Sequence, residues 1–409
     1  MSGPLSGVRV LELATFVAAP VTARILADMG AEVIKVEAPT GDGWRYSGIS
    51  HGAPRFTKDE NPIFDIYNTG KKLVSLNLKT PKGMEAFMKL LSESDVFVTS
   101  AREGALKRLG LAYDDLKEKF PGLIYAMLLG YGKKGPEADR PAYDVTAFWS
   151  RGGFLRDMAC NEENFYMPVN APSSVGDTAT GYLLVSEICA ALFRRSKDGK
   201  GEFVSSTLYH NGVFCMGTMV IKSQEPFGHK YPYSRVQHGA ASGNFECADG
   251  EWIYMSVGRH PQAFEKLLEK LGCPDLHDDP RFKDVTSRLQ HRQEYYDYFR
   301  RGFLSRSSSE WMELAYEYDM PMTKIVHFRD VAKDEQAWAN GYLEHVEFRT
   351  GNVDVMPASP IEMESAHPAP TKPAPWIGGD TTEVLQSIGY TDGEIAEMLA
   401  SGAAVENKS

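Results

Sequence analysis

The chain has 409 residues, of which 43% are hydrophobic, and a formal net charge of -11; this composition excludes a disordered chain and predicts two or three domains with cores of their own. No run of Lys or Arg exceeds two residues, so no nucleic-acid partner is expected, because phosphate backbones bind basic surfaces. The five cysteines contain no Cys-x-x-Cys pair and no two histidines have the spacing of helical metal ligands, which disfavours disulfides and a metal site.

The first 130 residues alternate between apolar strands and amphipathic helices. The predicted strands are residues 8–13, 31–37, 73–78, 96–99 and 123–129, and the predicted helices between them are residues 21–29, 82–91 and 105–120. Such alternation predicts an α/β fold with a Rossmann-like, doubly wound parallel sheet. Ligands of these sheets bind at the carboxyl ends of the strands. A site is therefore expected at the loops of residues 14–20, 100–104 and 130–135.

The first of these loops does not support a dinucleotide site. Such sites need the pattern Gly-x-Gly-x-x-Gly so that the backbone can approach a pyrophosphate. Residues 14–20 read Ala-Thr-Phe-Val-Ala-Ala-Pro and contain no glycine. The small residues at 18–20 suit the close approach of another ligand, or simply tight packing.

Residues 174–181 place one carboxylate between glycines at the start of a helix predicted over residues 178–195. Asp177 could be a nucleophile there, because Gly176 and Gly181 would leave room for a bulky substrate. Backbone N–H groups near Gly176 and Thr178 would stabilise negative charge. The alternative is structural, since Asp is a preferred helix N-cap.

The second half of the chain predicts a smaller α+β domain. This smaller domain is expected to contain a hairpin at 244–257 and mainly helices at 262–316, after a Gly/Pro-rich linker at 223–243. Outside it, the expected elements are a strand at residues 202–208, a helix at 212–221, later helices at 334–342 and 381–399, a Pro-rich run at 357–375 and a loose tail at 403–409. We expect a large domain that begins with residues 1–222 and is completed by residues 331–409, with a small domain at 223–330.

A series of motifs runs in order along the sequence. They are Gly7-Val8-Arg9-Val10-Leu11-Glu12-Leu13, Leu26 to Glu37, Gly41-Asp42, Lys71-Lys72, Arg108 to Leu111, Gly130-Tyr131-Gly132, Gly135-Pro136, Tyr143-Asp144, Val175-Gly176-Asp177, Gly199 to Glu202, Asp334 to Ala337, and Pro373-Ala374-Pro375 leading to Val384-Leu385. With these motifs the chain resembles the class III CoA-transferase family, also called the CaiB/BaiF family, along nearly its whole length.

The resemblance implies an enzyme that moves CoA from an acyl- or enoyl-CoA to a carboxylic acid. Asp177 matches the family's catalytic aspartate, which forms an aspartyl anhydride and an aspartyl-CoA thioester. CoA is then a substrate, and no permanently bound cofactor or metal is expected. The family pattern also implies an interlocked homodimer.

The same pattern gives the expected substrate contacts. They are Phe16, Val17, Ala18, Lys71, Ser100, Arg102, Arg108, Tyr143 and Gly176. Lys71 and Arg108 are expected to meet the CoA phosphates, and Tyr143 to lie near the catalytic carboxylate. The alternatives are exposed surface charges and a packed aromatic residue.

Several positions depart from the family pattern. Ala38 stands where some relatives carry a cation, which Arg45 could replace, and Ser100 stands in place of an asparagine contact. The family's late His is Asp380 here, for which the sequence offers no explanation. A run of four glycines typical of formyl-CoA:oxalate members is absent near residues 237–243, which disfavours oxalate or formate as substrates.

Residues 13–20 and 334–343 look most like transferases of anaerobes that act on 2-hydroxy acids, such as phenyllactate or 2-hydroxyisocaproate, in amino-acid fermentation. Phe16 and Val17 with Phe148 and Trp149 could form an apolar pocket for such a side chain, or belong to the core. Two alternatives stay open: a 2-methylacyl-CoA racemase, which needs an acid/base pair, and a silent acyl-CoA-binding protein. No apolar run of 18 residues and no signal-peptide pattern occur, so a cytoplasmic protein without membrane contact is expected.

Overall fold

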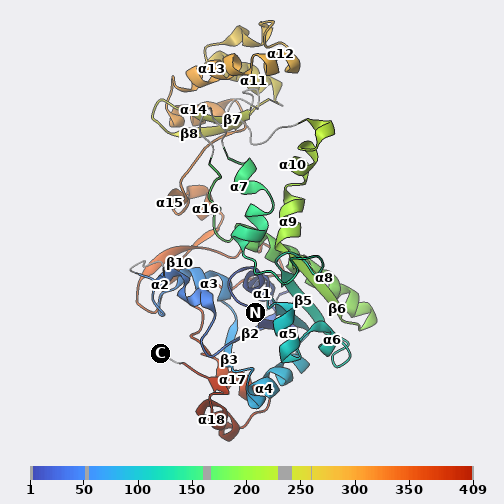
Figure 1. Cartoon of the computed structure of the whole chain (residues 1–409). Helices are drawn as coiled ribbons and strands as arrows, with labels where there is room; N and C mark the ends of the chain where they lie inside the picture. The colour runs from blue at the N-terminus through green and yellow to red at the C-terminus, as the bar shows by residue number, and fades with distance from the viewer. Residues whose placement is uncertain (1–2, 51–54, 160–166, 229–241, 259, 408–409) are drawn as a thin grey trace. The chain divides into compact units, whose positions relative to one another are not determined.

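The computed structural model describes residues 3–50, 55–159, 167–228, 242–258 and 260–407. Its centre is a seven-stranded sheet in the order β12-β3-β2-β1-β4-β5-β6 (Figure 1). The strands are β1 (Arg9–Leu13), β2 (Glu32–Glu37), β3 (Lys72–Leu76), β4 (Val96–Thr99), β5 (Ile124–Leu129), β6 (Glu202–Thr207) and β12 (Ala404–Val405). All neighbours pair in parallel except β12, which is antiparallel to β3. The order 3-2-1-4-5-6 is that of the Rossmann fold, so the predicted α/β class and sheet are confirmed.

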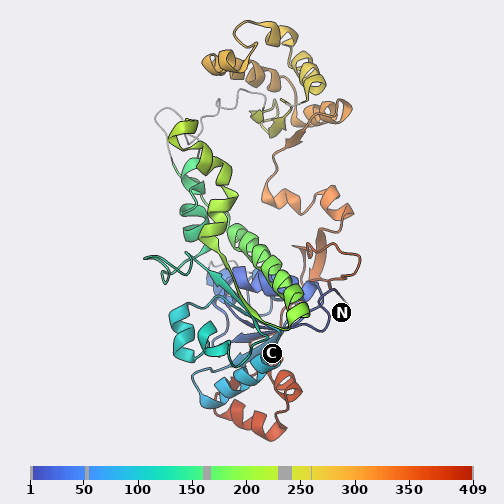
Figure 2. The same ribbon diagram turned by 90° about the vertical axis from the view of Figure 1, so that its right-hand side faces the viewer.

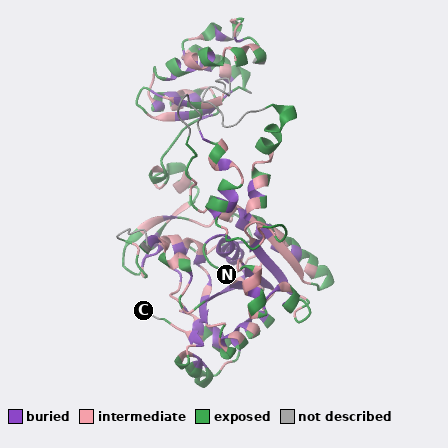
Figure 3. Cartoon of the chain, viewed as in Figure 1, coloured by how far each residue is buried: buried purple, intermediate pink, exposed green. Residues whose placement is uncertain are grey.

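Helices cover both faces of this sheet. They are α1 (Ala18–Asp28), α4 (Pro81–Ser92), α5 (Glu103–Leu109), α6 (Tyr113–Leu116), α8 (Val175–Asp198), α17 (Thr381–Ser387) and α18 (Asp392–Ala400). One face packs an apolar core against α4, α5, α6, α17 and α18. On the other face α8 contacts β5, β6 and α1, and Figure 2 shows this long helix lying across the sheet. Buried residues concentrate in the strands between the two layers (Figure 3).

The C-terminal segment is ordered against the sheet, so the predicted loose tail at residues 403–409 is wrong for its first residues. Ala403 and Ala404 are 2% and 1% exposed, and the Asn77 N–H donates to the Ala403 carbonyl at 2.8 Å. A pairing of two residues with a strand more than 300 positions away leaves no periodic signal in the sequence. β3 ends at Leu76, two residues before the predicted end.

Asp380 has a structural role at the same edge of the sheet. Its carboxylate accepts a hydrogen bond from the Leu73 N–H at 2.8 Å, and its own N–H donates to the Leu73 carbonyl at 3.1 Å. Thr381 Oγ1 continues the pattern by accepting from the Ser75 N–H at 3.1 Å. Asp380 thus attaches the returning chain to β3.

The chain divides into two compact units. One contains residues 1–154, 171–220 and 335–409, and the other residues 155–170 and 221–334. The first also holds η1 (Gly43–Tyr46), α2 (Ser47–Ser50), α3 (Pro62–Asn68), the π-helix η2 (Asp144–Ser150), α9 (Leu208–Cys215), α16 (Glu335–Ala339) and the hairpin β10 (Leu343–Glu347) with β11 (Val353–Pro357); α10 (Gly217–Lys222) follows α9. The helix predicted at residues 212–221 is therefore two helices, beginning at Leu208.

The second unit combines a small antiparallel sheet with helices. Its elements are α7 (Phe154–Asp157, begun in the first unit), η3 (Glu225–Phe227), β7 (Ser242–Glu246), β8 (Trp252–Ser256), α11 (Pro261–Lys270), η4 (Pro274–Asp278), α12 (Val285–Gln290), α13 (Arg292–Phe303), α14 (Ser308–Glu317), β9 (Met322–Lys324) and α15 (Phe328–Val331). β7 and β8 form the predicted hairpin, whose turn closes with the Gly250 N–H donating to the Cys247 carbonyl. Most of the predicted linker lies outside the described residues. In the part of the chain described, no helix is long and apolar enough to span a membrane.

Candidate active site

Asp177 is the third residue of α8, and it does not cap that helix. The helix begins three residues before the predicted start, because Ser174 takes the N-cap position with a left-handed φ of 70° and the Thr178 N–H donates to the Ser174 carbonyl at 2.9 Å. The capping alternative for Asp177 is therefore wrong. The expected oxyanion role of the Thr178 N–H is wrong too, because this group is already used within the helix.

A second carboxylate, Asp144, lies beside Asp177. Asp144 begins η2 and is 5% exposed. Its Oδ2 accepts a hydrogen bond from Trp149 Nε1 at 3.2 Å, and the backbone N–H groups of Ser174, Gly176 and Asp177 face its carboxylate. Burial, with the negative charge of Asp144, raises the pKa of Asp177 to about 7. Burial also raises the pKa of Asp144. Two interacting carboxylates with raised pKa values are typical of a reactive site.

The two glycines beside Asp177 are required by packing within the chain. A Cβ on Gly176 would overlap with Asp144 Oδ1 and the Phe148 ring, and one on Gly181 would overlap with Val21 of α1. The space that the missing side chains leave is filled by these residues. The prediction that the glycines leave room for a substrate is therefore wrong for this conformation.

Tyr67 of α3 is a site residue that the sequence did not indicate. Its hydroxyl lies near the side chains of Ser174 and Thr178, and burial raises its pKa, an effect to which the charge of Asp177 adds. Tyr67 thus lies against the first turn of α8, beside the left-handed Ser174. Nothing in the local sequence distinguishes this tyrosine, which lies more than 100 residues before Asp177.

We expect Tyr67→Phe to lower kcat/KM for CoA transfer about three- to tenfold, because the first turn of α8 loses the polar hydroxyl that lies beside Ser174 and Thr178. Tyr182→Phe is the matched control, since Tyr182 lies on α8 and is 43% exposed; it should leave the rate within twofold. Equal rates for the two variants would show that the Tyr67 hydroxyl does not position Asp177.

The loop after β1 reaches two other predicted site residues. The Thr15 N–H donates to Ser100 Oγ at 3.5 Å. The Phe16 ring lies edge-on to Tyr143 with 5.4 Å between centroids, and 6.2 Å from Trp44. Phe16 and Tyr143 are 37% and 55% exposed. We call Phe16, Trp44 and Tyr143 the aromatic cluster; it joins the loop after β1 to the residue preceding Asp144.

Other predicted apolar contacts lie in the core. Val17 and Ala18 are 1% and 7% exposed, so in this conformation neither offers a ligand more than a small part of its surface. Phe148 and Trp149 pack against Phe154 with ring centroids 4.9 and 5.0 Å apart. The apolar pocket suggested for Phe148 and Trp149 is wrong, and their assignment to the core is confirmed.

Lys71 is buried rather than exposed. Its ammonium binds Glu12 Oε2 at 2.7 Å, the Pro20 carbonyl at 2.8 Å and Asn68 Oδ1 at 3.1 Å. Burial lowers its pKa to about 8, against the effect of Glu12. A contact of Lys71 with a CoA phosphate would require this network to open.

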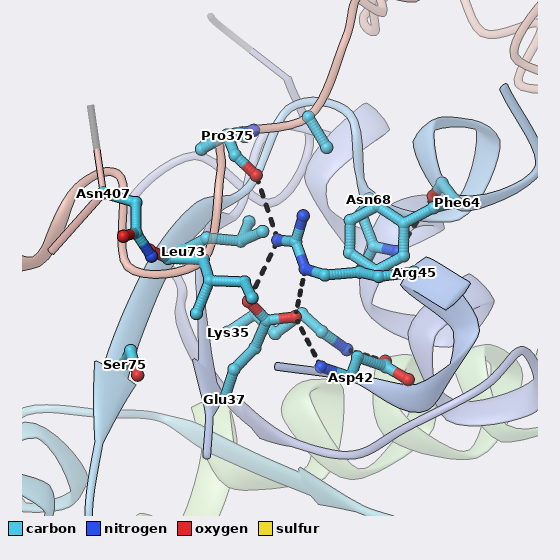
Figure 4. A network of polar contacts seen from close by, with 12 residues as sticks. Lys35, Glu37, Asp42, Arg45, Phe64, Asn68, Leu73, Ser75, Pro375 and Asn407 are labelled. Carbon is cyan, nitrogen blue, oxygen red and sulfur yellow. Dashed lines mark hydrogen bonds and ion pairs between the residues drawn. The ribbon is translucent and has the colours of Figure 1, made fainter. Parts of the chain in front are cut away.

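Arg45 is the suggested replacement for the cation missing at Ala38. Its side chain already binds other residues of the chain. Its guanidinium makes two hydrogen bonds of 2.9 Å with the Glu37 carboxylate and one of 3.0 Å with the Pro375 carbonyl, and it stacks on Phe64 (Figure 4).

Exposed cations gather instead at the carboxyl ends of β4 and β5. A hollow of about 520 Å³, open to solvent, is lined there by Ser100, Arg102, Lys133 and Arg140 among others. Arg108 lies further along α5 and is exposed. These loops are two of the three at which the sequence predicts a site. Among the described residues, no group of acidic, His or Cys side chains could hold a metal ion.

The family model "CoA-transferase family III" matches residues 5–381, and the chain belongs to this family. The enzyme is thus a family III CoA-transferase, whose substrates are CoA thioesters.

Curated relatives and solved structures agree with this assignment. (R)-2-hydroxy-4-methylpentanoate CoA-transferase from Clostridioides difficile is 38% identical over 96% of this chain and 97% of its own length. Cinnamoyl-CoA:phenyllactate CoA-transferase from Clostridium sporogenes is 34% identical over 96% and 95%. A point mutant of Rv3272 from Mycobacterium tuberculosis superposes with a TM-score of 0.80, at 27% identity over 94% of this chain and 99% of the other. A CAIB/BAIF family protein from Brucella suis gives 0.79, at 26% identity over 95% and 100%.

Proposed function

We propose that this enzyme transfers CoA from an acyl- or enoyl-CoA to a 2-hydroxy acid, with Asp177 as the covalent nucleophile. The carboxylate pair is the observation that supports Asp177 as the nucleophile. Burial and the charge of Asp144 keep Asp177 more basic than an ordinary aspartate. A more basic carboxylate attacks a carbonyl carbon more readily. The substrate class is supported by the two relatives whose names include 2-hydroxy-4-methylpentanoate and phenyllactate.

The proposed reaction has four acyl-transfer steps. The Asp177 carboxylate attacks the thioester carbon of the donor, and the C–S bond breaks to give a mixed anhydride and CoA thiolate. The thiolate attacks the aspartyl carbon, which releases the donor acid and leaves an aspartyl-CoA thioester. The acceptor carboxylate then displaces the thiolate to form a second anhydride. Thiolate attack on the acceptor carbon gives the new acyl-CoA and restores Asp177.

The aromatic cluster supports an acceptor with an apolar side chain. It presents the partly exposed rings of Phe16 and Tyr143 beside the residue that begins η2. Ring surfaces of this kind bind branched or aromatic side chains through apolar contact. We do not propose a racemase, because this arrangement pairs two carboxylates.

A panel of acceptors tests the substrate class. With cinnamoyl-CoA or an isocaprenoyl-CoA as donor, we expect at least tenfold higher kcat/KM for 2-hydroxy-4-methylpentanoate or phenyllactate than for oxalate or glutarate. Formation of acyl-CoA is followed by liquid chromatography. A preference for a dicarboxylate would refute the proposal that the acceptor is a 2-hydroxy acid. Exchange of the α-proton in deuterated water without an acceptor acid would favour a racemase.

We also propose that the working enzyme is a homodimer without a permanently bound cofactor. Large apolar side chains are exposed on α8 and α9 of the single chain, with Leu183 40%, Phe193 65% and Phe214 81% exposed. Exposed apolar side chains of this size favour association. Sedimentation at micromolar concentration should give twice the mass of one chain; a monomer with full activity would contradict the dimer.

A further inference from the structure

Phe16 has a backbone conformation that its side chain disfavours. Its φ is 66°, and only three non-glycine residues described in the chain have positive φ, among them Ser174 at the start of α8. A left-handed non-glycine residue persists only where its surroundings hold it. Phe16 carries the ring that contacts Tyr143. The strain therefore lies where the loop after β1 meets the carboxylate site.

The side chain that holds this conformation is Asp42. Its Oδ1 accepts hydrogen bonds from the Phe16 N–H at 3.0 Å and the Trp44 N–H at 2.9 Å. Asp42 is 1% exposed, so competition from water is small. The same carboxylate therefore fixes the backbone of two of the three residues of the aromatic cluster.

Asp42 is itself held by a buried ammonium group. Lys35 Nζ pairs with Asp42 Oδ2 at 3.0 Å and with Glu12 Oε1 at 2.8 Å, and it donates to the Ala14 carbonyl at 2.9 Å. Lys35 thus binds both Asp42 and the start of the loop that contains Phe16. Figure 4 shows Lys35 and Asp42 beside the Glu37–Arg45 pair.

We propose that Asp42 is a positioning residue for CoA transfer: by holding Phe16 at positive φ, it sets the aromatic cluster against the carboxylate site and so orients the acyl group. This role rests on the proposed function of Asp177. It predicts that Asp42 acts through the backbone of residue 16 rather than through general stability.

Removal of the Phe16 ring separates these effects. We expect Asp42→Ala to lower kcat/KM about tenfold in the unaltered enzyme but less than threefold in a Phe16→Ala enzyme, because no ring is left there to position. Equal losses in the two backgrounds would overturn the proposal. Asp42→Asn, whose amide oxygen can still accept both hydrogen bonds, should lose less activity than Asp42→Ala.

Thermal unfolding gives a readout that does not depend on transfer. Glycine adopts positive φ readily and alanine does not. Phe16→Gly should therefore unfold at a higher temperature than Phe16→Ala, the reverse of their usual order. Asp42→Ala should make this difference smaller, because residue 16 is then no longer held at positive φ. A lower unfolding temperature for Phe16→Gly than for Phe16→Ala would show that the backbone at residue 16 is not strained. If the unaltered enzyme shows no CoA transfer between any of the donors and acceptors tested, the proposed function fails. The unfolding comparison still decides whether Asp42 holds residue 16 at positive φ.

Discussion

Asp177→Asn should lower kcat for CoA transfer by about 10⁴-fold or more, because an amide cannot form the anhydride and what is left is background catalysis. Glu187→Gln is the matched control. It makes the same carboxylate-to-amide change on α8, at a residue that accepts a hydrogen bond from Ser206 of β6. The control should retain activity within twofold. An Asp177→Asn enzyme with more than a tenth of the normal rate would exclude Asp177 as the nucleophile.

The same substitution should stabilise the protein at neutral and alkaline pH. The pKa of Asp177 is raised from 3.8 to about 7, so between these values the folded state binds more protons than the unfolded state. This contribution to stability is complete below pH 4 and is lost as the pH rises through 7. At pH 8 we expect the free energy of unfolding of Asp177→Asn to be roughly 2 kcal/mol higher than that of the unaltered chain. This difference is smaller than the full pKa shift would give, because Asp177 is only partly buried. Urea titrations at pH 5 and pH 8 measure the difference.

Asp144→Asn should shift the pH profile of transfer to lower pH by roughly one unit. In the unaltered enzyme kcat/KM should rise with pH and reach half its plateau near pH 7, because the attacking form of Asp177 is deprotonated. Removal of the neighbouring negative charge lowers the pKa of Asp177, although burial, the larger cause of the shift, still holds it above the usual value.

The pH profile separates this electrostatic role from a structural one. Loss of the Trp149 hydrogen bond or looser packing of η2 would reduce the plateau without moving the midpoint. Glu187→Gln should leave the midpoint unchanged. A midpoint of the Asp144→Asn enzyme equal to that of the unaltered enzyme would mean that Asp144 does not tune Asp177.

Local patterns predicted the sheet and the position of the site. Alternating strands and helices gave five parallel strands, and the loops at their carboxyl ends meet, as the contact between Thr15 and Ser100 demonstrates. The motif around Asp177 gave the candidate nucleophile. These features depend on periodicity and short motifs, which a single sequence carries.

Features that depend on distant pairing could not be predicted. Lys71, which precedes β3, pairs with Glu12 on β1, and the Tyr67 hydroxyl lies near Ser174 although it comes from a separate helix. The left-handed Ser174 moved the start of α8 so that Asp177 does not cap it. The local sequence contains the residue types but not the contacts that decide their roles.

Trapping the covalent intermediate tests the nucleophilic role of Asp177 most directly. The enzyme is incubated with cinnamoyl-CoA or an isocaprenoyl-CoA, treated with hydroxylamine, digested and analysed by mass spectrometry, with Asp177→Asn as the blank. An anhydride or thioester on Asp177 predicts a hydroxamate at that residue and none in the blank. Turnover of the donor with no hydroxamate at Asp177, or with one at another carboxylate, would contradict the account.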